Sequence, residues 1–102
     1  MAISNVELHG SWYAIFDDDG EKIKDLPASA VGDLCGNGND FIVFCKGSWY
    51  GIYDETGKKI KDLPVSTVGE FENASGDTIV FRKGSWIDTY DKSGRKVNSR
   101  PA

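Results

Sequence analysis

Residues 10–32 read GSWYAIFDDDGEKIKDLPASAVG, and residues 47–69 repeat this stretch as GSWYGIYDETGKKIKDLPVSTVG. The two copies lie 37 residues apart, and residues 10–34 and 47–71 are identical at 16 of 25 positions. A looser third copy, GSWIDTYDKSGRKVNSRP, begins another 37 residues further on, at residues 84–101. The chain is therefore one supersecondary unit repeated three times, and any site that the unit carries is expected up to three times.

The second copy shows most clearly how a unit is built. Its apolar run FIVFCK, residues 41–46, is rich in β-branched and aromatic side chains and predicts a buried strand. A turn leads into a second strand over residues 49–53. Residues 54–57, DETG, predict a tight hairpin turn, because the Asp carboxylate accepts backbone hydrogen bonds and Gly supplies a positive φ. A third, more polar strand over residues 58–63 is expected near a sheet edge.

The same strand and turn residues recur at equivalent positions in the three copies, so we predict an all-β protein with a single domain over residues 1–102. It consists of three tandem units of about 37 residues, each with three to four antiparallel strands. The units span residues 4–27, 41–64 and 78–101, and the connectors span residues 28–40 and 65–77, the second of which holds one further brief strand. We expect a closed or rolled sheet with a pseudo-threefold repeat. The alternative is a propeller-like half-ring completed by dimerisation. Both faces of the central strand are apolar in the first two units, so either face could be the core.

Composition and charge limit the functions that fit. A formal net charge of −4 argues against nucleic-acid binding, which needs a basic surface. We find neither a bilayer-length apolar run nor a leader of signal type at Met1, and we expect a cytoplasmic protein without membrane contact. Cys35 and Cys45 do not follow the repeat, which favours reduced thiols over a framework disulfide. Without a clustered histidine they are too few for a zinc site, so no metal or cofactor is expected.

The GSW motif lies between an apolar strand and a D-x-x-G hairpin, and such a unit resembles the bacterial WG-type β-repeat. The matching stretches are VFCKGSWYGIYDETGKKI, residues 43–60, and VFRKGSWIDTYDKSGRKV, residues 80–97. The preceding VGEFENASGD, residues 68–77, is similar to the inter-unit segment of that family. The resemblance implies a β-repeat module without established enzymatic chemistry.

The strongest candidates for binding residues are Trp12, Trp49 and Trp86, one in each unit. An indole stacks on the apolar face of a sugar ring while nearby carboxylates bind its hydroxyls. The other candidate binding residues are Tyr13, Tyr50, Asp17, Asp54 and Asp91. The alternative is that each tryptophan simply anchors the core of its unit. Asp88, which replaces Gly51 on the tryptophan face, argues against a sugar site in the third unit.

Neither a catalytic set nor a metal site stands out. His9, the single histidine, falls in the slot of Lys46 and Lys83 before the GSW turn, which favours a solvated turn position over a catalytic base. Residues 17–20, DDDG, suggest calcium, but the loop is shorter than an EF-hand loop and its sister loops have one Asp each. We therefore predict that the protein is not an enzyme and binds no metal.

The sequence leaves two classes of function open. The first is a non-enzymatic protein-interaction module, monomeric or homodimeric. Its connectors 28–40 and 65–77 carry the specificity, because they diverge while the framework persists. The second is a lectin-like carbohydrate binder that uses the repeated tryptophans, where three weak sites gain affinity through multivalency.

Overall fold

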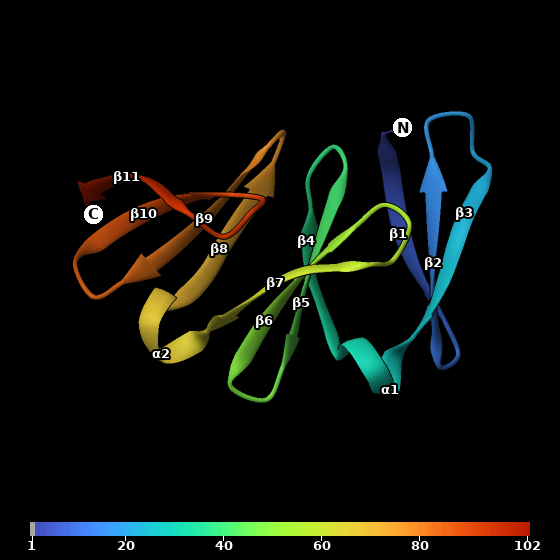
Figure 1. Cartoon of the computed structure of the whole chain (residues 1–102), viewed down its shortest axis with the longest axis horizontal. Helices are drawn as coiled ribbons and strands as arrows, with labels where there is room; N and C mark the ends of the chain where they lie inside the picture. Colours follow the sequence, from blue (N-terminus) through green and yellow to red (C-terminus); the bar gives the residue numbers. More distant parts are fainter. Residues whose placement is uncertain (1) are drawn as a thin grey trace.

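A computed structural model describes residues 2–102, and Met1, the first residue of the predicted domain, lies outside the described residues. The described chain is all-β, as predicted, with three antiparallel sheets and two one-turn helices (Figure 1). The sheet orders are β1–β2–β3, β4–β5–β6–β7 and β11–β10–β9–β8. The strands are β1 (Ile3–His9), β2 (Trp12–Asp17), β3 (Lys22–Pro27), β4 (Asp33–Asn37), β5 (Phe41–Lys46), β6 (Trp49–Asp54), β7 (Lys59–Pro64), β8 (Glu70–Ser75), β9 (Thr78–Lys83), β10 (Trp86–Asp91) and β11 (Lys96–Pro101). The helices are α1 (Ala28–Val31) and α2 (Val65–Val68).

The strands predicted for the second unit are confirmed. The first predicted strand coincides with β5, the second extends by one residue to Asp54 in β6, and the third is shifted by one residue in β7. As expected from its polar sequence, β7 lies at a sheet edge, and so do β3 and β11. The brief strand expected in the second connector is longer than predicted, because β8 has six residues.

Each hairpin turn after the central strand is held by its aspartate. In the second unit, Asp54 Oδ1 accepts hydrogen bonds from the backbone N–H groups of Thr56 and Lys58, both at 2.9 Å. The turn also contains Gly57 at φ +86°, a conformation that side-chain-bearing residues rarely adopt. The predicted turn chemistry is therefore confirmed, and it aligns β6 with β7.

The two connectors begin with a single helical turn that the sequence did not predict. In α1 the turn closes when the N–H of Gly32 donates to the carbonyl oxygen of Ala28 at 2.8 Å, and Gly69 repeats this bond with Val65 in α2. Both glycines have φ +92°. Four residues are too few for a helical period to appear in the sequence. Neither helix of the described chain is long and apolar enough to cross a membrane.

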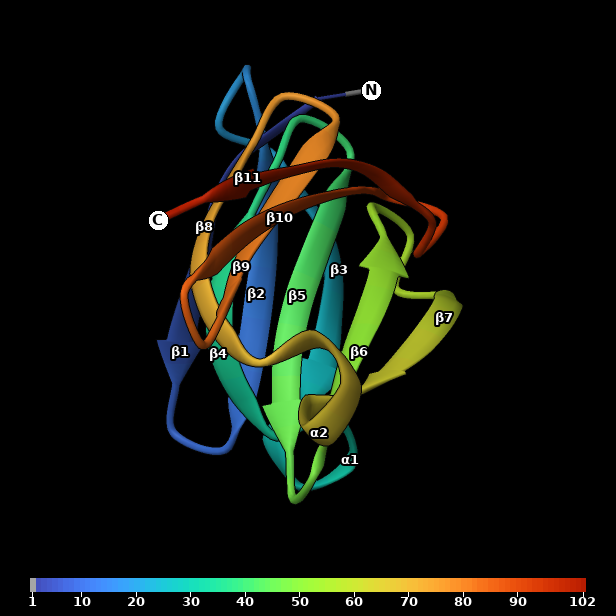
Figure 2. The same ribbon diagram turned by 90° about the vertical axis from the view of Figure 1, so that its left-hand side faces the viewer.

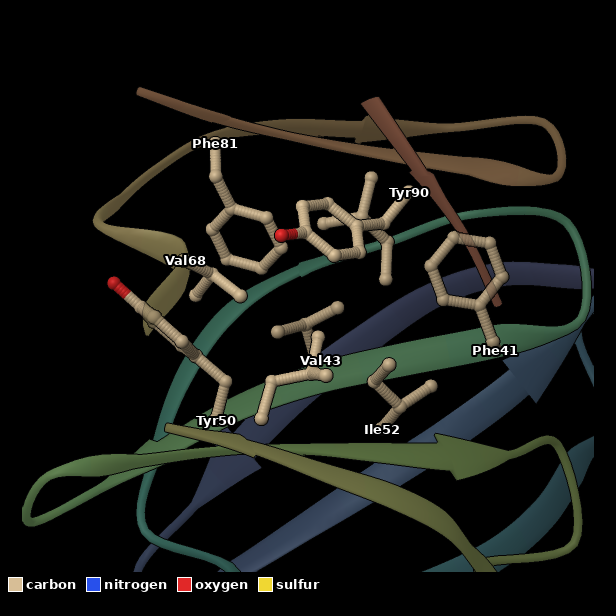
Figure 3. Packing of buried hydrophobic residues seen from close by; sticks show 9 residues of the cluster. Phe41, Val43, Tyr50, Ile52, Val68, Phe81 and Tyr90 are labelled. Atoms are coloured by element: carbon tan, nitrogen blue, oxygen red, sulfur yellow. The ribbon is translucent and has the colours of Figure 1, made fainter. Parts of the chain in front are cut away.

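The three sheets pack face to face in chain order, so the middle sheet is covered on both faces (Figure 1). One core cluster joins the first sheet to the second and consists of Ile3, Tyr13, Ile15, Leu26, Val31, Ile42, Phe44 and Tyr53. The other joins the second sheet to the third and consists of Phe41, Val43, Tyr50, Ile52, Leu63, Val68, Ile79, Phe81 and Tyr90 (Figure 3). Both faces of the central strand are therefore core in the middle unit, which settles the question that the sequence left open.

Equivalent aromatic contacts hold each pair of neighbouring sheets together. The rings of Tyr13 and Phe44 lie 5.0 Å apart between the first two sheets, and those of Tyr50 and Phe81 lie 5.0 Å apart between the second and third. The Tyr13 hydroxyl accepts a hydrogen bond from the N–H of Leu34 at 3.1 Å, so its polar end is satisfied where the ring is buried. The sheets therefore pack through one repeated tyrosine–phenylalanine contact.

The single closed or rolled sheet that we expected is not confirmed, because the three described sheets stay separate and none closes on itself (Figure 2). The connectors explain why. Each leads from the outer edge strand of one sheet to a new first strand, β4 or β8, which pairs within the next sheet. These first strands, β4 and β8, lie against each other. The described chain extends over 39 × 26 × 19 Å.

Candidate functional site

The three tryptophans are partly open to solvent. Trp12, Trp49 and Trp86 each retain 50% of their accessible surface, whereas the neighbouring Tyr13 and Tyr50 retain 5% and 6%. The tyrosine points to the face opposite the tryptophan and enters the core, whereas the tryptophan, the first residue of its strand, lies at the end of the sheet and outside both core clusters. The interpretation of the tryptophans as core anchors is therefore wrong, because the tyrosines have that role in the first two units.

A hollow of about 220 Å³ lies beside Trp49 in the middle unit. Its lining comprises Ala30, Val31, Lys46, Trp49, Gly51, Tyr53, Lys59 and Asp62. The Lys46 Nζ donates hydrogen bonds to the carbonyl oxygens of Ser29 at 3.0 Å and Ala30 at 3.3 Å, and so fixes α1 at the rim. The groove beside Trp49 thus lies between one unit and the connector that precedes it.

The pairing of β6 with β7 brings the polar groups of this groove together. Asp62 lies opposite Gly51, and Lys59 lies opposite Tyr53, so these residues share the face of Trp49. A Cβ at Gly51 would lie 2.9 Å from the Tyr53 ring, so glycine leaves room for that ring. Lys59 Nζ lies 3.1 Å from Asp62 Oδ1, and this hydrogen-bonded contact raises the pKa of Lys59. The groove therefore contains an indole, a lysine ammonium group that can donate hydrogen bonds, and a carboxylate.

The third unit holds the same groups in another arrangement. Its hollow of about 400 Å³ is lined by Lys83, Trp86, Asp88, Lys96 and Ser99. Asp88 and Ser99 lie opposite each other, and the Ser99 hydroxyl donates to Asp88 Oδ1 at 2.5 Å. Lys96 Nζ lies 3.7 Å from Asp88 Oδ2. Asp88 therefore places a carboxylate in the hollow beside Trp86, as Asp62 does in the hollow beside Trp49.

The first unit repeats the charged pair without the same surroundings. Asp25 lies opposite Ala14, and Lys22 Nζ lies 3.2 Å from Asp25 Oδ2. Each unit thus places one tryptophan, one lysine and one carboxylate on the same sheet face. No sheet precedes the first unit within residues 2–102, so the tryptophan face of this sheet is uncovered.

The other predicted site residues lie outside the grooves. Tyr13 and Tyr50 are buried in the cores. Asp17, Asp54 and Asp91 end the central strands, whereas the tryptophans begin them. About five residues of strand, roughly 16 Å, separate the two sets. The aspartates instead hold the hairpin turns.

The Asp91 carboxylate accepts several hydrogen bonds within its own hairpin turn. The Ser93 hydroxyl and the backbone N–H of Arg95 both donate to Asp91 Oδ1, and these bonds lower the pKa of Asp91. Asp17 Oδ1 likewise accepts the N–H groups of Asp19 and Glu21 at 2.9 Å. The turn aspartates are thus structural residues of the hairpins. Within residues 2–102, no three or more metal-ligating side chains come together.

The lysine–aspartate pairs on the tryptophan faces were not among the predicted site residues. Their signal was the motif KIKDLP, which is identical at residues 22–27 and 59–64 although its strand is exposed. An exposed edge strand tolerates most polar residues. That the first two units have the same lysine and aspartate here, Lys22 and Asp25 in one and Lys59 and Asp62 in the other, therefore indicates a role other than forming the strand.

Cys35 and Cys45 are both free and half-buried. Burial, together with electrostatic repulsion from Cys45 and from the Asp33 carboxylate, raises the pKa of the Cys35 thiol to about 11. Because the thiolate is the reactive form, we expect alkylation of Cys35 near neutral pH to be about a hundredfold slower than for an ordinary exposed thiol. The measurement is the iodoacetamide rate of Cys35 in the unaltered chain, distinguished from that of Cys45 by mass spectrometry of the alkylated peptides, with the urea-unfolded chain as control. Equal rates in the folded and unfolded states would contradict this expectation.

Comparison with known proteins gives no family assignment. A scan of protein-family models and searches of curated proteins and of solved structures found no significant match to this chain. The resemblance to the WG-type β-repeat therefore stays a prediction.

Proposed function

We propose that this protein is a non-enzymatic binding module and that its ligands are carbohydrates held in the tryptophan grooves. The observation that carries the proposal is that Trp12, Trp49 and Trp86 are all half-exposed, each on the same sheet face as a lysine–carboxylate pair. An exposed indole offers a flat apolar surface to the C–H face of a sugar. The charged groups beside it bind hydroxyls, which fixes the orientation of the ring.

The predicted pseudo-threefold repeat is part of this proposal. Three equivalent units give up to three equivalent sites, and a branched or surface-bound glycan that engages several of them gains avidity without any new contact. The hollow beside Trp86 is larger than that beside Trp49, so the two sites would accept sugars of different size or substitution.

The test is binding to an array of glycans, followed by titration calorimetry with the best ligand. Replacing Trp49 by alanine is expected to weaken binding at that groove at least about tenfold, which corresponds to roughly 1.4 kcal/mol. The matched control is Ile60→Ala, because Ile60 is an exposed apolar side chain of β7 that does not line the groove. Equal affinities of the two variants would contradict the proposal, as would an array on which the folded protein binds nothing.

A protein partner is the second candidate function. It is favoured by the connector residues Ala30 and Val31, which line the groove beside Trp49 and differ from their counterparts Thr67 and Val68 at one position. In this alternative, connectors 28–40 and 65–77 select the partner. Exchanging Ala30 for threonine would then change partner affinity, and the folded protein would bind no glycan on the array.

A further inference from the structure

The two exposed ends of the sheet stack carry opposite charge. Residues 4–27, the first unit, contain six acidic and two basic side chains, whereas residues 78–101, the third unit, contain two acidic and six basic ones. The middle unit, residues 41–64, is nearly balanced, with three acidic and four basic side chains. The small net charge of the whole chain therefore hides a strong separation of charge between its two end sheets.

Two arginines of the third sheet occupy positions that are apolar in the other two sheets. On the face that each sheet turns toward the next sheet, three residues on neighbouring strands lie opposite one another in a row. This row is Leu8, Tyr13 and Leu26 in the first sheet and Cys45, Tyr50 and Leu63 in the second. The same row in the third sheet is Arg82, Ile87 and Arg100. This row has no sheet against it in the described chain, and both arginines are exposed.

The opposite end of the stack shows the complementary change. Phe44 and Phe81 lie on the face that each sheet turns toward the preceding one, where they contact Tyr13 and Tyr50. Their counterpart in the first sheet is the exposed Glu7. A third sheet packed on a first sheet in the repeated geometry would thus place Glu7 against Ile87, between the two arginines.

A second contact follows from the hairpin turns. A Cβ at Gly57 would meet Leu26, and a Cβ at Gly94 would meet Leu63, so each of these leucines lies against the turn of the next sheet. Arg100 is the counterpart of the leucines, and the corresponding turn of the first sheet is the acidic DDDG of residues 17–20. Arg100 would therefore lie beside Asp18 and Asp19 in the same geometry.

The shape of the described chain fits half of a ring. Its longest extent, 39 Å, is about twice its shortest, 19 Å, as expected for a half-disc. The outer strands β3 and β11 lie at opposite ends of the molecule with β4 and β8 between them (Figure 1). Rings of four-stranded sheets close with four to eight members, and three sheets are half of six.

We propose that a second copy of this chain completes the ring, with the basic third sheet of each copy against the acidic first sheet of the other. A twofold axis relates the copies and generates the same contact twice, so the assembly closes as a dimer. Because exposed charge pairs are screened by salt, the dissociation constant is expected to rise at least about tenfold between low ionic strength and about 1 M salt. This inference is independent of the ligand of the grooves.

The test is sedimentation velocity of the full chain and of two charge-reversed variants at low ionic strength. The wild type is expected to sediment as a dimer, with twice the chain mass of 11.2 kDa. R82E/R100E and E7R/D19R should each be monomeric alone, because like charges then meet at both contacts. An equimolar mixture should restore a dimer, since the two reversed faces complement each other at one contact and the two unchanged faces do so at the other. The control K58E/R95E changes the net charge as much as R82E/R100E but leaves the end faces intact, so it should remain dimeric.

Several outcomes would overturn the proposal. These are a monomeric wild type at high protein concentration, a dimer that persists in both reversed variants, a mixture that stays monomeric, and a wild type that forms open polymers. Circular dichroism and thermal unfolding of each variant verify that it is folded. The replaced residues are all exposed, so the fold is expected to tolerate their substitution.

Discussion

Replacing Phe81 by alanine is expected to lower the free energy of unfolding by about 3–5 kcal/mol, the usual cost of removing a fully buried phenylalanine. Phe81 has no exposed surface, and its ring lies 5.0 Å from that of Tyr50, 5.4 Å from that of Tyr90 and 6.1 Å from that of Phe71. The side chain joins the second sheet to the third (Figure 3). Its loss leaves a cavity in the core between these two sheets, and a cost of this size is a large fraction of the total stability of a small domain.

Equilibrium urea unfolding measures this loss. The matched control is Trp86→Ala, which removes a larger but half-exposed aromatic side chain from the same sheet and is expected to cost only about 1 kcal/mol. If the two variants were equally stable, the core described between the second and third sheets would be wrong.

Replacing Gly32 by alanine is expected to destabilise the protein by about 3 kcal/mol, from backbone strain and a steric clash together. Gly32 has φ +92°, and a Cβ there would meet the carbonyl oxygen of Cys45 and lie 2.8 Å from Lys46 Cβ. Neither neighbour is free to move, because both belong to β5 in the middle of a sheet.

The control for Gly32 is Gly47→Ala. Gly47 has φ +62°, and a Cβ added there would have no neighbouring atom within 4 Å, so only the conformational cost of about 1 kcal/mol is expected. Urea unfolding of the two variants separates strain from clash. Equal destabilisation would show that the close approach of α1 to β5 does not constrain the fold.

The repeat predicted the strands and turns well because both depend on local chemistry. The apolar run of β5 and the Asp54–Gly57 hairpin can be recognised from a few residues, and both are confirmed. The stacking of sheets was harder, because alternation along a strand shows which residues share a face but not which faces are covered. In the middle unit both are covered, so Tyr50 and Tyr53 are each buried from opposite sides.

The exposure of the tryptophans could not be predicted for a related reason. Trp49 is the first residue of β6 and pairs with Lys46 and Pro64 at the end of the sheet, beside the hairpin turn. Tyr53 lies on the same face near the other end of β6 and is covered by the first sheet. Coverage therefore depends on how far the neighbouring sheet extends, which is a property of tertiary packing.

The central claim is that the open grooves beside Trp49 and Trp86 bind sugar, and nuclear magnetic resonance of the indole N–H groups tests it most directly. We expect the signals of Trp49 and Trp86 to shift on titration with the glycan that binds best on the array, while the backbone signals of the buried Phe81 and Ile52 do not move. Single tryptophan-to-phenylalanine variants assign the signals. A glycan that binds without moving any indole signal would contradict the account.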